Sequence, residues 1–170
     1  MSQQEIAVVV GATGAMGAVI SRRLAAEGLK VLAVARKADA LASLVATTPN
    51  VVACTADISN DSAIDAIQAA LDAPVRMVVH GPGVATAGGV LVAPTAAVVD
   101  AVNLKVGGMM RLVRAVDGRL QRGSRLVAIG WHYGSAPNPW AATAGVGNAA
   151  LTNLMRQYSW AYGPRGITAH

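Results

Sequence analysis

Three glycines near the amino terminus are spaced as in loops that hold a phosphate. They lie in Val10-Gly11-Ala12-Thr13-Gly14-Ala15-Met16-Gly17, between an apolar run at 6–10 and a helical pattern at 16–27. In such loops one glycine permits a tight turn, another lets the backbone approach a pyrophosphate, and the last lets helix and strand pack closely. The helix start then offers free N–H groups and a positive dipole end. The pattern predicts dinucleotide contacts at Gly11, Thr13, Gly14, Met16 and Gly17, the alternative being an ordinary glycine-rich turn.

A second group of chemically useful residues follows the apolar run at 31–35. A carboxylate at this point would accept hydrogen bonds from a ribose 2′-hydroxyl, but the nearest one is Asp39. Arg36 and Lys37 stand there instead, and a guanidinium fork and an ammonium both suit a 2′-phosphate. We therefore expect NADP(H) to be favoured over NAD(H). The alternative is a solvated basic pair in a loop.

The segments that must position these residues alternate between short apolar runs and longer amphipathic ones. Strands are predicted at 6–10, 31–35, 51–54, 76–79, 126–129 and 166–170, and helices at 16–27, 41–45, 62–71, 95–120 and 141–162. Continuous apolar strands that alternate with helices indicate parallel βαβ units buried on both faces. The prediction is one α/β domain over 1–170, a doubly wound parallel sheet with helices on both faces.

Composition narrows the class of protein. The chain has 170 residues, 54% hydrophobic, a formal charge of +5 and a single cysteine, Cys54. One cysteine excludes an internal disulfide framework and a cysteine-rich zinc site, and no metal site is expected. No apolar run is long enough for a transmembrane helix, and the polar start is unlike a secretory signal. Because the basic residues are scattered, we expect no nucleic-acid partner. From the lack of a long apolar run and from the single cysteine, we expect no membrane association and a cytoplasmic location.

Taken together, these segments resemble the short-chain dehydrogenase/reductase family, whose fold is a Rossmann-like sheet. The spacing of the three loop glycines resembles the variant used by extended and atypical members. The resemblance implies that Asp57, followed by Ile58, contacts the adenine ring. His80 and Gly81 stand where the family has an asparagine pair near the adenosine ribose, so they are expected to contact the cofactor or, for His80, to bond structurally.

The resemblance also places the catalytic positions. Asn148-Ala149-Ala150-Leu151 resembles the family's Lys-Ala-Ala-Leu. In that register Asn148 occupies the position of a lysine that lowers the pKa of the catalytic tyrosine, and Ala144 occupies the tyrosine's position. The serine that orients the substrate oxygen falls on Gly130 or Trp131. All three catalytic side chains are therefore absent.

Other residues are candidates to replace them. Asn103 matches an asparagine that, in the family, bends a helix and positions a water beside the catalytic lysine. His132 and Tyr133 follow the fifth predicted strand and have groups that donate or accept a proton. The alternative for this pair is a loop tip with a packed tyrosine. Lys105 is expected on another face of the helix that carries Asn103.

These features lead to two hypotheses about function. The first is an NADP(H)-binding oxidoreductase of this family with a degenerate catalytic site. The second is a non-catalytic nucleotide-binding or scaffolding subunit that pairs with an active partner. The chain stops near the start of the sixth predicted strand, where the family continues, so a truncated sheet is expected. Small residues in 141–150 favour close helix approach, so we expect homo- or hetero-oligomers through 95–120 and 141–162.

Overall fold

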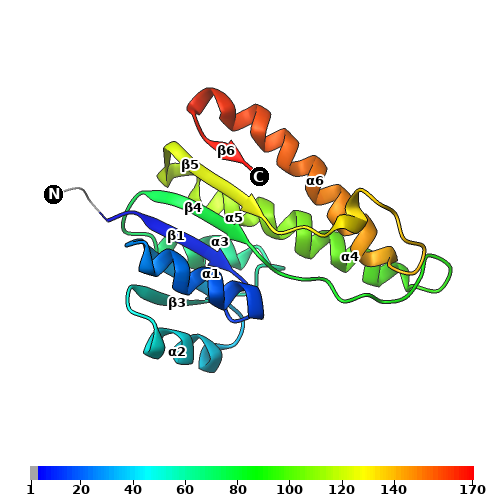
Figure 1. The fold of residues 1–170 in the computed structure, drawn as a ribbon, viewed down its shortest axis with the longest axis horizontal. Helices are drawn as coiled ribbons and strands as arrows, with labels where there is room; N and C mark the ends of the chain where they lie inside the picture. Colours follow the sequence, from blue (N-terminus) through cyan, green and yellow to red (C-terminus); the bar gives the residue numbers. More distant parts are fainter. Residues whose placement is uncertain (1–3) are drawn as a thin grey trace.

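A single parallel sheet forms the centre of the molecule in a computed structural model, which describes residues 4–170. Its six strands lie in the order β3-β2-β1-β4-β5-β6, and every neighbouring pair is parallel (Figure 1). The strands are β1 (Ile6–Val10), β2 (Lys30–Ala35), β3 (Val51–Thr55), β4 (Val75–His80), β5 (Leu120–Ala128) and β6 (Thr168–Ala169). The order reverses direction between β1 and β4, which is where open α/β sheets bind ligands. The predicted α/β fold is confirmed.

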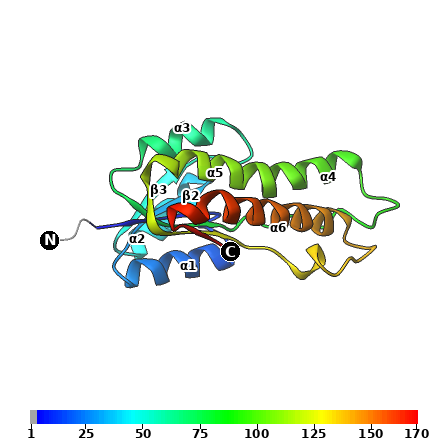
Figure 2. The ribbon, with the colours of Figure 1, turned by 90° about the horizontal axis from the view of Figure 1, so that it is seen from above.

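Helices cover the sheet in two layers (Figure 2). They are α1 (Ala15–Ala26), α2 (Ala38–Thr47), α3 (Ser62–Ala69), α4 (Thr95–Val102), α5 (Gly108–Val116) and α6 (Ala142–Tyr162). Side chains of α1 and α2 share one buried cluster with one face of the sheet, and side chains of α3, α5 and α6 share another with the opposite face. All five residues of β1 are buried, because the strand is central and packed on both sides.

The helix predicted over 95–120 is divided in the structure. It begins as α4, passes through a π-helical turn at Asn103–Gly107, and continues as α5. The Gly108 N–H bonds to the carbonyl of Asn103, five residues earlier, which widens this turn. A short 3₁₀ turn at Asp117–Arg119 then leads directly into β5. The strand therefore starts six residues before the predicted 126, with an irregularity near Gly123, whose φ is +88°.

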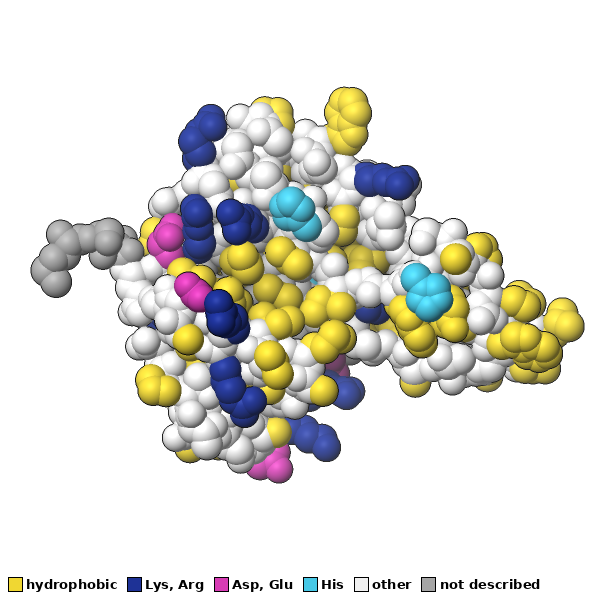
Figure 3. Space-filling model, in the orientation of Figure 1, with side chains coloured by type: hydrophobic (Ala, Val, Ile, Leu, Met, Phe, Trp, Pro, Cys, Tyr) yellow, Lys and Arg dark blue, Asp and Glu magenta, His cyan; other side chains and the backbone are white. Residues whose placement is uncertain are grey.

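The end of the molecule beyond the carboxyl ends of the strands forms a projection (Figure 1). It consists of α4, the first half of α6 and the loops at 81–94 and 131–141. The two loops meet where the N–H of Val90 donates to the carbonyl of Pro139 at 2.8 Å. Apolar side chains gather at the tip of the projection (Figure 3), and Leu91 and Trp140 are among the most exposed apolar residues of the chain. Among residues 4–170, no helix is both long and apolar enough to span a bilayer.

Candidate functional site

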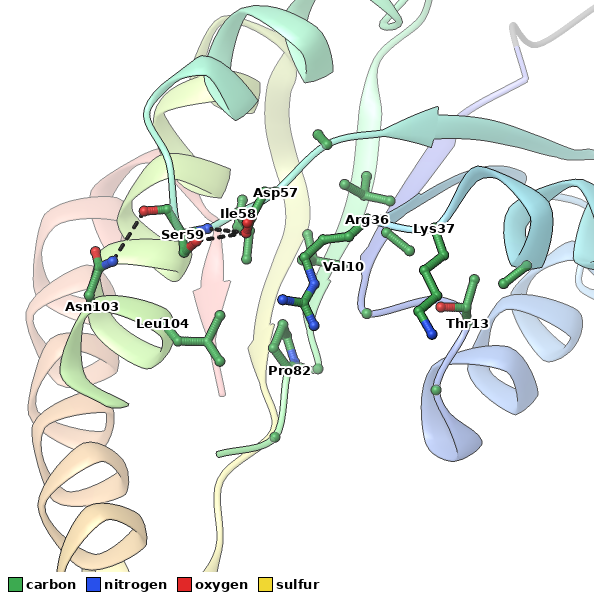
Figure 4. A pocket seen from close by; sticks show the side chains of 18 of the residues that line it. Val10, Thr13, Arg36, Lys37, Asp57, Ile58, Ser59, Pro82, Asn103 and Leu104 are labelled. Atoms are coloured by element: carbon green, nitrogen blue, oxygen red, sulfur yellow. Dashed lines mark hydrogen bonds between the residues drawn. The ribbon is translucent and has the colours of Figure 1, made fainter. Parts of the chain in front are cut away.

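A cavity of about 790 Å³ opens at the carboxyl ends of β1, β2, β3 and β4 (Figure 4). It lies where the strand order reverses, so the sheet itself creates the opening. Nine of the residues predicted to contact a dinucleotide or to act in catalysis line it: Gly11, Thr13, Gly14, Arg36, Lys37, Asp57, Ile58, Gly81 and Asn103. These residues are spread over 93 positions of sequence, from 11 to 103, and the topology brings them to one cavity.

The glycine loop forms the floor of this cavity between β1 and α1. Gly11 has a φ of +80°, a left-handed conformation that favours glycine, and its N–H donates to the carbonyl of Val34 at 2.9 Å. A Cβ at Gly17 would lie 2.1 Å from the Gly11 carbonyl oxygen, so only glycine permits this close approach of helix and loop. Helix α1 has no side-chain cap at Gly14. Its first N–H groups are therefore available to an anion.

Two cations overhang the cavity from the end of β2. Arg36 extends toward its centre and Lys37 toward Thr13 (Figure 4). They are the only lysine and arginine among the residues that line the cavity, and both are exposed. An anionic group between the two would meet a guanidinium and an ammonium together.

The wall opposite Arg36 is a turn after β3. The Asp57 carboxylate accepts hydrogen bonds from the Ser59 hydroxyl at 2.7 Å and the Ser59 N–H at 3.0 Å. These bonds, with a smaller contribution from the Arg36 charge, lower the pKa of Asp57 below its ordinary value. Asp57 is thus an anionic acceptor fixed in place, while Ile58 offers an apolar surface beside it.

The remaining wall is held by the π-helical turn. The Asn103 side-chain amide donates to the Ser59 carbonyl at 3.1 Å, and its oxygen accepts from the Arg111 guanidinium at 3.0 Å. Arg111 also donates to the Ile58 carbonyl at 3.3 Å and forms an ion pair with Asp61. Asn103 is therefore tied to the turn after β3, on the side of the cavity occupied by Asp57.

Three predicted cofactor contacts do not line the cavity. Met16 is exposed on α1, and Gly17 serves to pack that helix. His80 is fully buried, with Nε2 3.1 Å from the Leu104 carbonyl. Burial, with a smaller effect of the Lys105 charge, lowers the pKa of His80 to about 4. His80 is therefore neutral at physiological pH and bonds to the π-helical turn rather than to the cavity.

The other two predicted catalytic residues lie in a 3₁₀ turn after β5. His132 and Tyr133 form an aromatic cluster with Trp131, with ring centroids 4.1 Å apart for His132 and Tyr133 and 4.6 Å apart for Trp131 and Tyr133. They do not line the cavity, although β5 adjoins the strand whose end does. The aromatic cluster therefore lies beyond the cavity, past the end of β5.

The positions assigned to the family's tyrosine and lysine are both buried. Ala144 is 1% exposed and Asn148 is 3% exposed. The Asn148 side chain accepts from the Trp131 N–H at 3.1 Å and donates to the Ala144 carbonyl at 2.7 Å. Asn148 thus fastens the loop after β5 to α6 and has a structural task.

Lys105 lies on another face of the helix than Asn103, and in the structure that face is buried. It is 4% exposed, and its ammonium donates to the carbonyl of Ile129 at 2.8 Å, at the end of β5. Burial lowers the pKa of Lys105 from its ordinary value. The π-helical turn directs Lys105 toward the sheet and Asn103 toward the turn after β3.

Sequence reasoning missed several residues of the site. Ser59, Asp100, Pro82 and Leu104 line the cavity, and Arg111 supports it from behind. Ser59 was foreseeable, since a serine two residues after an aspartate is a common turn partner. Among the described residues, no three His, Cys, Asp or Glu side chains cluster as they would around a metal ion.

Known proteins with a similar sequence or structure agree with this geometry. An uncharacterized short-chain type dehydrogenase/reductase of Sinorhizobium fredii is 29% identical over 155 residues, 89% of this chain and 61% of that protein. Polyketide synthase GfsA of Streptomyces halstedii is 33% identical over 120 residues, 65% of this chain and 2% of that protein. A short-chain dehydrogenase structure from Streptomyces avermitilis superposes with a TM-score of 0.90 at 26% identity, over 99% of this chain and 64% of that one.

The chain thus spans less than two thirds of the length of each of these relatives. The family model described as short chain dehydrogenase matches residues 5–170, nearly the whole chain. The chain belongs to the short-chain dehydrogenase/reductase family.

Proposed function

We propose that this chain binds NADP(H) in the cavity at the ends of β1 to β4. The observation that carries the proposal is the convergence of an uncapped helix start at Gly14, a close backbone approach at Gly11 and two cations after β2 in one cavity. The α1 amides would hold the diphosphate, and Asp57 with Ile58 would bound the adenosine.

The preference for the phosphorylated cofactor rests on Arg36 and Lys37. Proteins that share the fold, at 24% and 19% identity, are known in complexes with NADPH and with NADH, so the fold itself accommodates either cofactor. In this chain the end of β2 offers two cations to a 2′-phosphate. We propose NADP(H) as the physiological partner, in the cytoplasm.

The first candidate activity is oxidoreduction that does not use the family's tyrosine–lysine pair. When bound, the cofactor supplies the hydride. His132 and Tyr133 directly follow Gly130 and Trp131, one of which occupies the position of the family's serine. They lie beyond the cavity after β5, and either side chain is chemically able to donate a proton.

The second candidate is a non-catalytic nucleotide-binding subunit. The observation in its favour is that Asn148 uses both ends of its amide within the protein, and Ala144 is enclosed. Neither position is open to a substrate. A partner chain would then perform the chemistry, and exposed apolar residues on the helices, Val99 on α4 and Val146 and Trp160 on α6, are suited to homo- or hetero-oligomer contacts.

One experiment separates these candidates. NADPH and NADH are titrated against the purified chain by cofactor fluorescence, and NADPH oxidation is then followed over a panel of aldehydes and ketones. Binding with turnover that Tyr133→Phe or His132→Asn removes supports the oxidoreductase. Binding without turnover supports the non-catalytic subunit, and sedimentation of the same sample gives its oligomeric state. If neither NADPH nor NADH binds, the proposed function as a whole is contradicted.

A further inference from the structure

Lys105 is a buried cation without a carboxylate partner. It is 4% exposed, and the ion pairs among residues 4–170 do not include it. Its one hydrogen bond, to the carbonyl of Ile129, uses one of the three N–H groups of the ammonium. Burial of an ammonium without a countercharge is unfavourable, and one neutral carbonyl compensates little of it. A buried ammonium that lowers the stability of the free protein is expected where a bound ligand supplies an acceptor for it.

The surroundings of Lys105 place that partner at the end of β5. The Ile129 N–H donates to the carbonyl of His80 at 2.9 Å, which joins the end of β5 to the end of β4. Gly81, the next residue of that strand, lines the dinucleotide cavity, and a Cβ there would lie 3.7 Å from the Ile129 side chain. Lys105 thus reaches the strand next to the one that closes the cavity.

Two glycines lie close to Lys105 and to its acceptor. A Cβ at Gly147 of α6 would lie 3.6 Å from Lys105 Cγ, so the lysine stem packs against a glycine. Gly130 follows Ile129, and a Cβ there would meet only the Asn148 oxygen, at 3.6 Å. The stem of Lys105 therefore passes beside Gly147 of α6 to reach the carbonyl of Ile129 at the end of β5.

The order of the cavity's walls indicates which part of a dinucleotide comes near. Arg36 and Asp57 stand at the ends of β2 and β3, and the uncapped start of α1 stands beside β1. A dinucleotide whose adenosine lies at β2 and β3 and whose diphosphate lies at α1 extends its second half toward β4 and β5.

We propose, on the basis of the proposed function, that the Lys105 ammonium binds an oxygen of the nicotinamide half of NADP(H). The cation reaches the end of β5 from the π-helical turn, two residues after Asn103, rather than from α6. Lys105 is then a binding residue for the ribose or carboxamide oxygens, and it places a buried positive charge at the end of β5.

The test compares two ligands and four proteins, the unchanged protein and three variants. NADPH contains the nicotinamide half, whereas 2′,5′-ADP contains only the adenosine end. In Lys105→Met, NADPH should bind at least about tenfold more weakly, 2′,5′-ADP should bind as before, and the melting temperature without ligand should stay equal or rise. Lys30→Met, at an exposed ion pair with Asp72, is the matched control and should leave both affinities unchanged.

Other results overturn the inference. If Lys105→Met binds NADPH as the unchanged protein does, or if both ligands weaken together, Lys105 is only a structural tie to Ile129. Lys105→Gln retains an N–H donor for that carbonyl without the charge, so unchanged NADPH affinity in this variant refutes the inference even if Lys105→Met does not fold. Failure of the unchanged protein to bind either ligand refutes the proposed function itself, and with it the inference.

Discussion

The side-chain oxygen of Asn148 accepts a hydrogen bond from the backbone N–H of Trp131 at 3.1 Å, which fastens the loop after β5 to helix α6. By resemblance, Asn148 occupies the position of the family's lysine, and the serine position falls on Trp131 or on Gly130 beside it. In the structure, the side-chain amide of Asn148 makes a contact with the backbone at this position. Neither Asn148 nor Trp131 lines the cavity at the ends of β1 to β4.

Restoring a lysine at this position is expected to harm the protein. Asn148→Lys leaves the Trp131 N–H without its acceptor and places an ammonium in a buried position, so the free energy of unfolding should fall by about 1–3 kcal/mol. Urea denaturation measures this change. Asn153→Lys, on the exposed face of the same helix, is the control and should change stability by less than about 0.5 kcal/mol. A stable, reductase-active Asn148→Lys protein would contradict this account.

The glycine loop gives a second prediction. Gly17→Ala places a Cβ 2.1 Å from the Gly11 carbonyl oxygen, so α1 must move away from the loop. We expect a loss of about 1–3 kcal/mol of stability from overpacking and NADPH binding weakened at least about tenfold. Gly163→Ala, where a Cβ meets nothing within 4 Å, is the control. Normal NADPH affinity in Gly17→Ala would show that the diphosphate does not depend on this approach.

Arg36 should determine the choice between cofactors. Arg36→Ala removes a charge-assisted contact to the 2′-phosphate, so NADPH affinity should fall about tenfold to a hundredfold while NADH affinity stays the same. Fluorescence titration of both cofactors gives the ratio. Arg22→Ala, an exposed arginine on α1 outside the cavity residues, is the control. An equal loss of affinity for NADPH and NADH would show that Arg36 contacts a part of the molecule that both cofactors have.

His80 should make stability depend on pH. Its pKa is about 4 in the folded protein and about 6.5 when exposed, so the unfolded chain binds more protons between these values. The contribution of neutral His80 to the free energy of unfolding is therefore fully present above pH 6.5. It is lost as the pH falls toward 4, by up to about 3 kcal/mol. The carboxylates make the same pH-dependent contribution to the stability of the unchanged protein and of His80→Asn. The difference between the free energies of unfolding of these two proteins therefore isolates the contribution of His80. A difference that does not vary with pH would contradict its burial as a neutral ring.

The fold was predictable because its signals are local. The apolar run from Ala7 to Val10 is buried on both faces of the sheet, and the spacing of Gly11, Gly14 and Gly17 marks the junction of strand and helix. Most of the cavity lining follows from residues at strand ends, because parallel strands bring these ends together.

The positions of Lys105, Asn103 and His80 were not predictable in the same way. They depend on a π-helical turn that widens the helix at Asn103. The resemblance implied a bend at Asn103, but the spacing of the residues alone is compatible with a regular helix. Two side-chain contacts accompany this turn. The Asn103 amide bonds to Ser59, 44 residues earlier in the chain, and to Arg111, 8 residues later. Spacing alone therefore placed Lys105 on another face without showing that this face is the buried one.

The most direct test of the account is the response of backbone amides to NADPH, followed by two-dimensional ¹H–¹⁵N NMR. The account predicts that the largest shifts fall on Gly11, Thr13 and the first turn of α1 at Ala15 to Gly17, with further shifts at Arg36 and Lys37. Saturable NADPH binding that leaves these amides unmoved and shifts another region would contradict it.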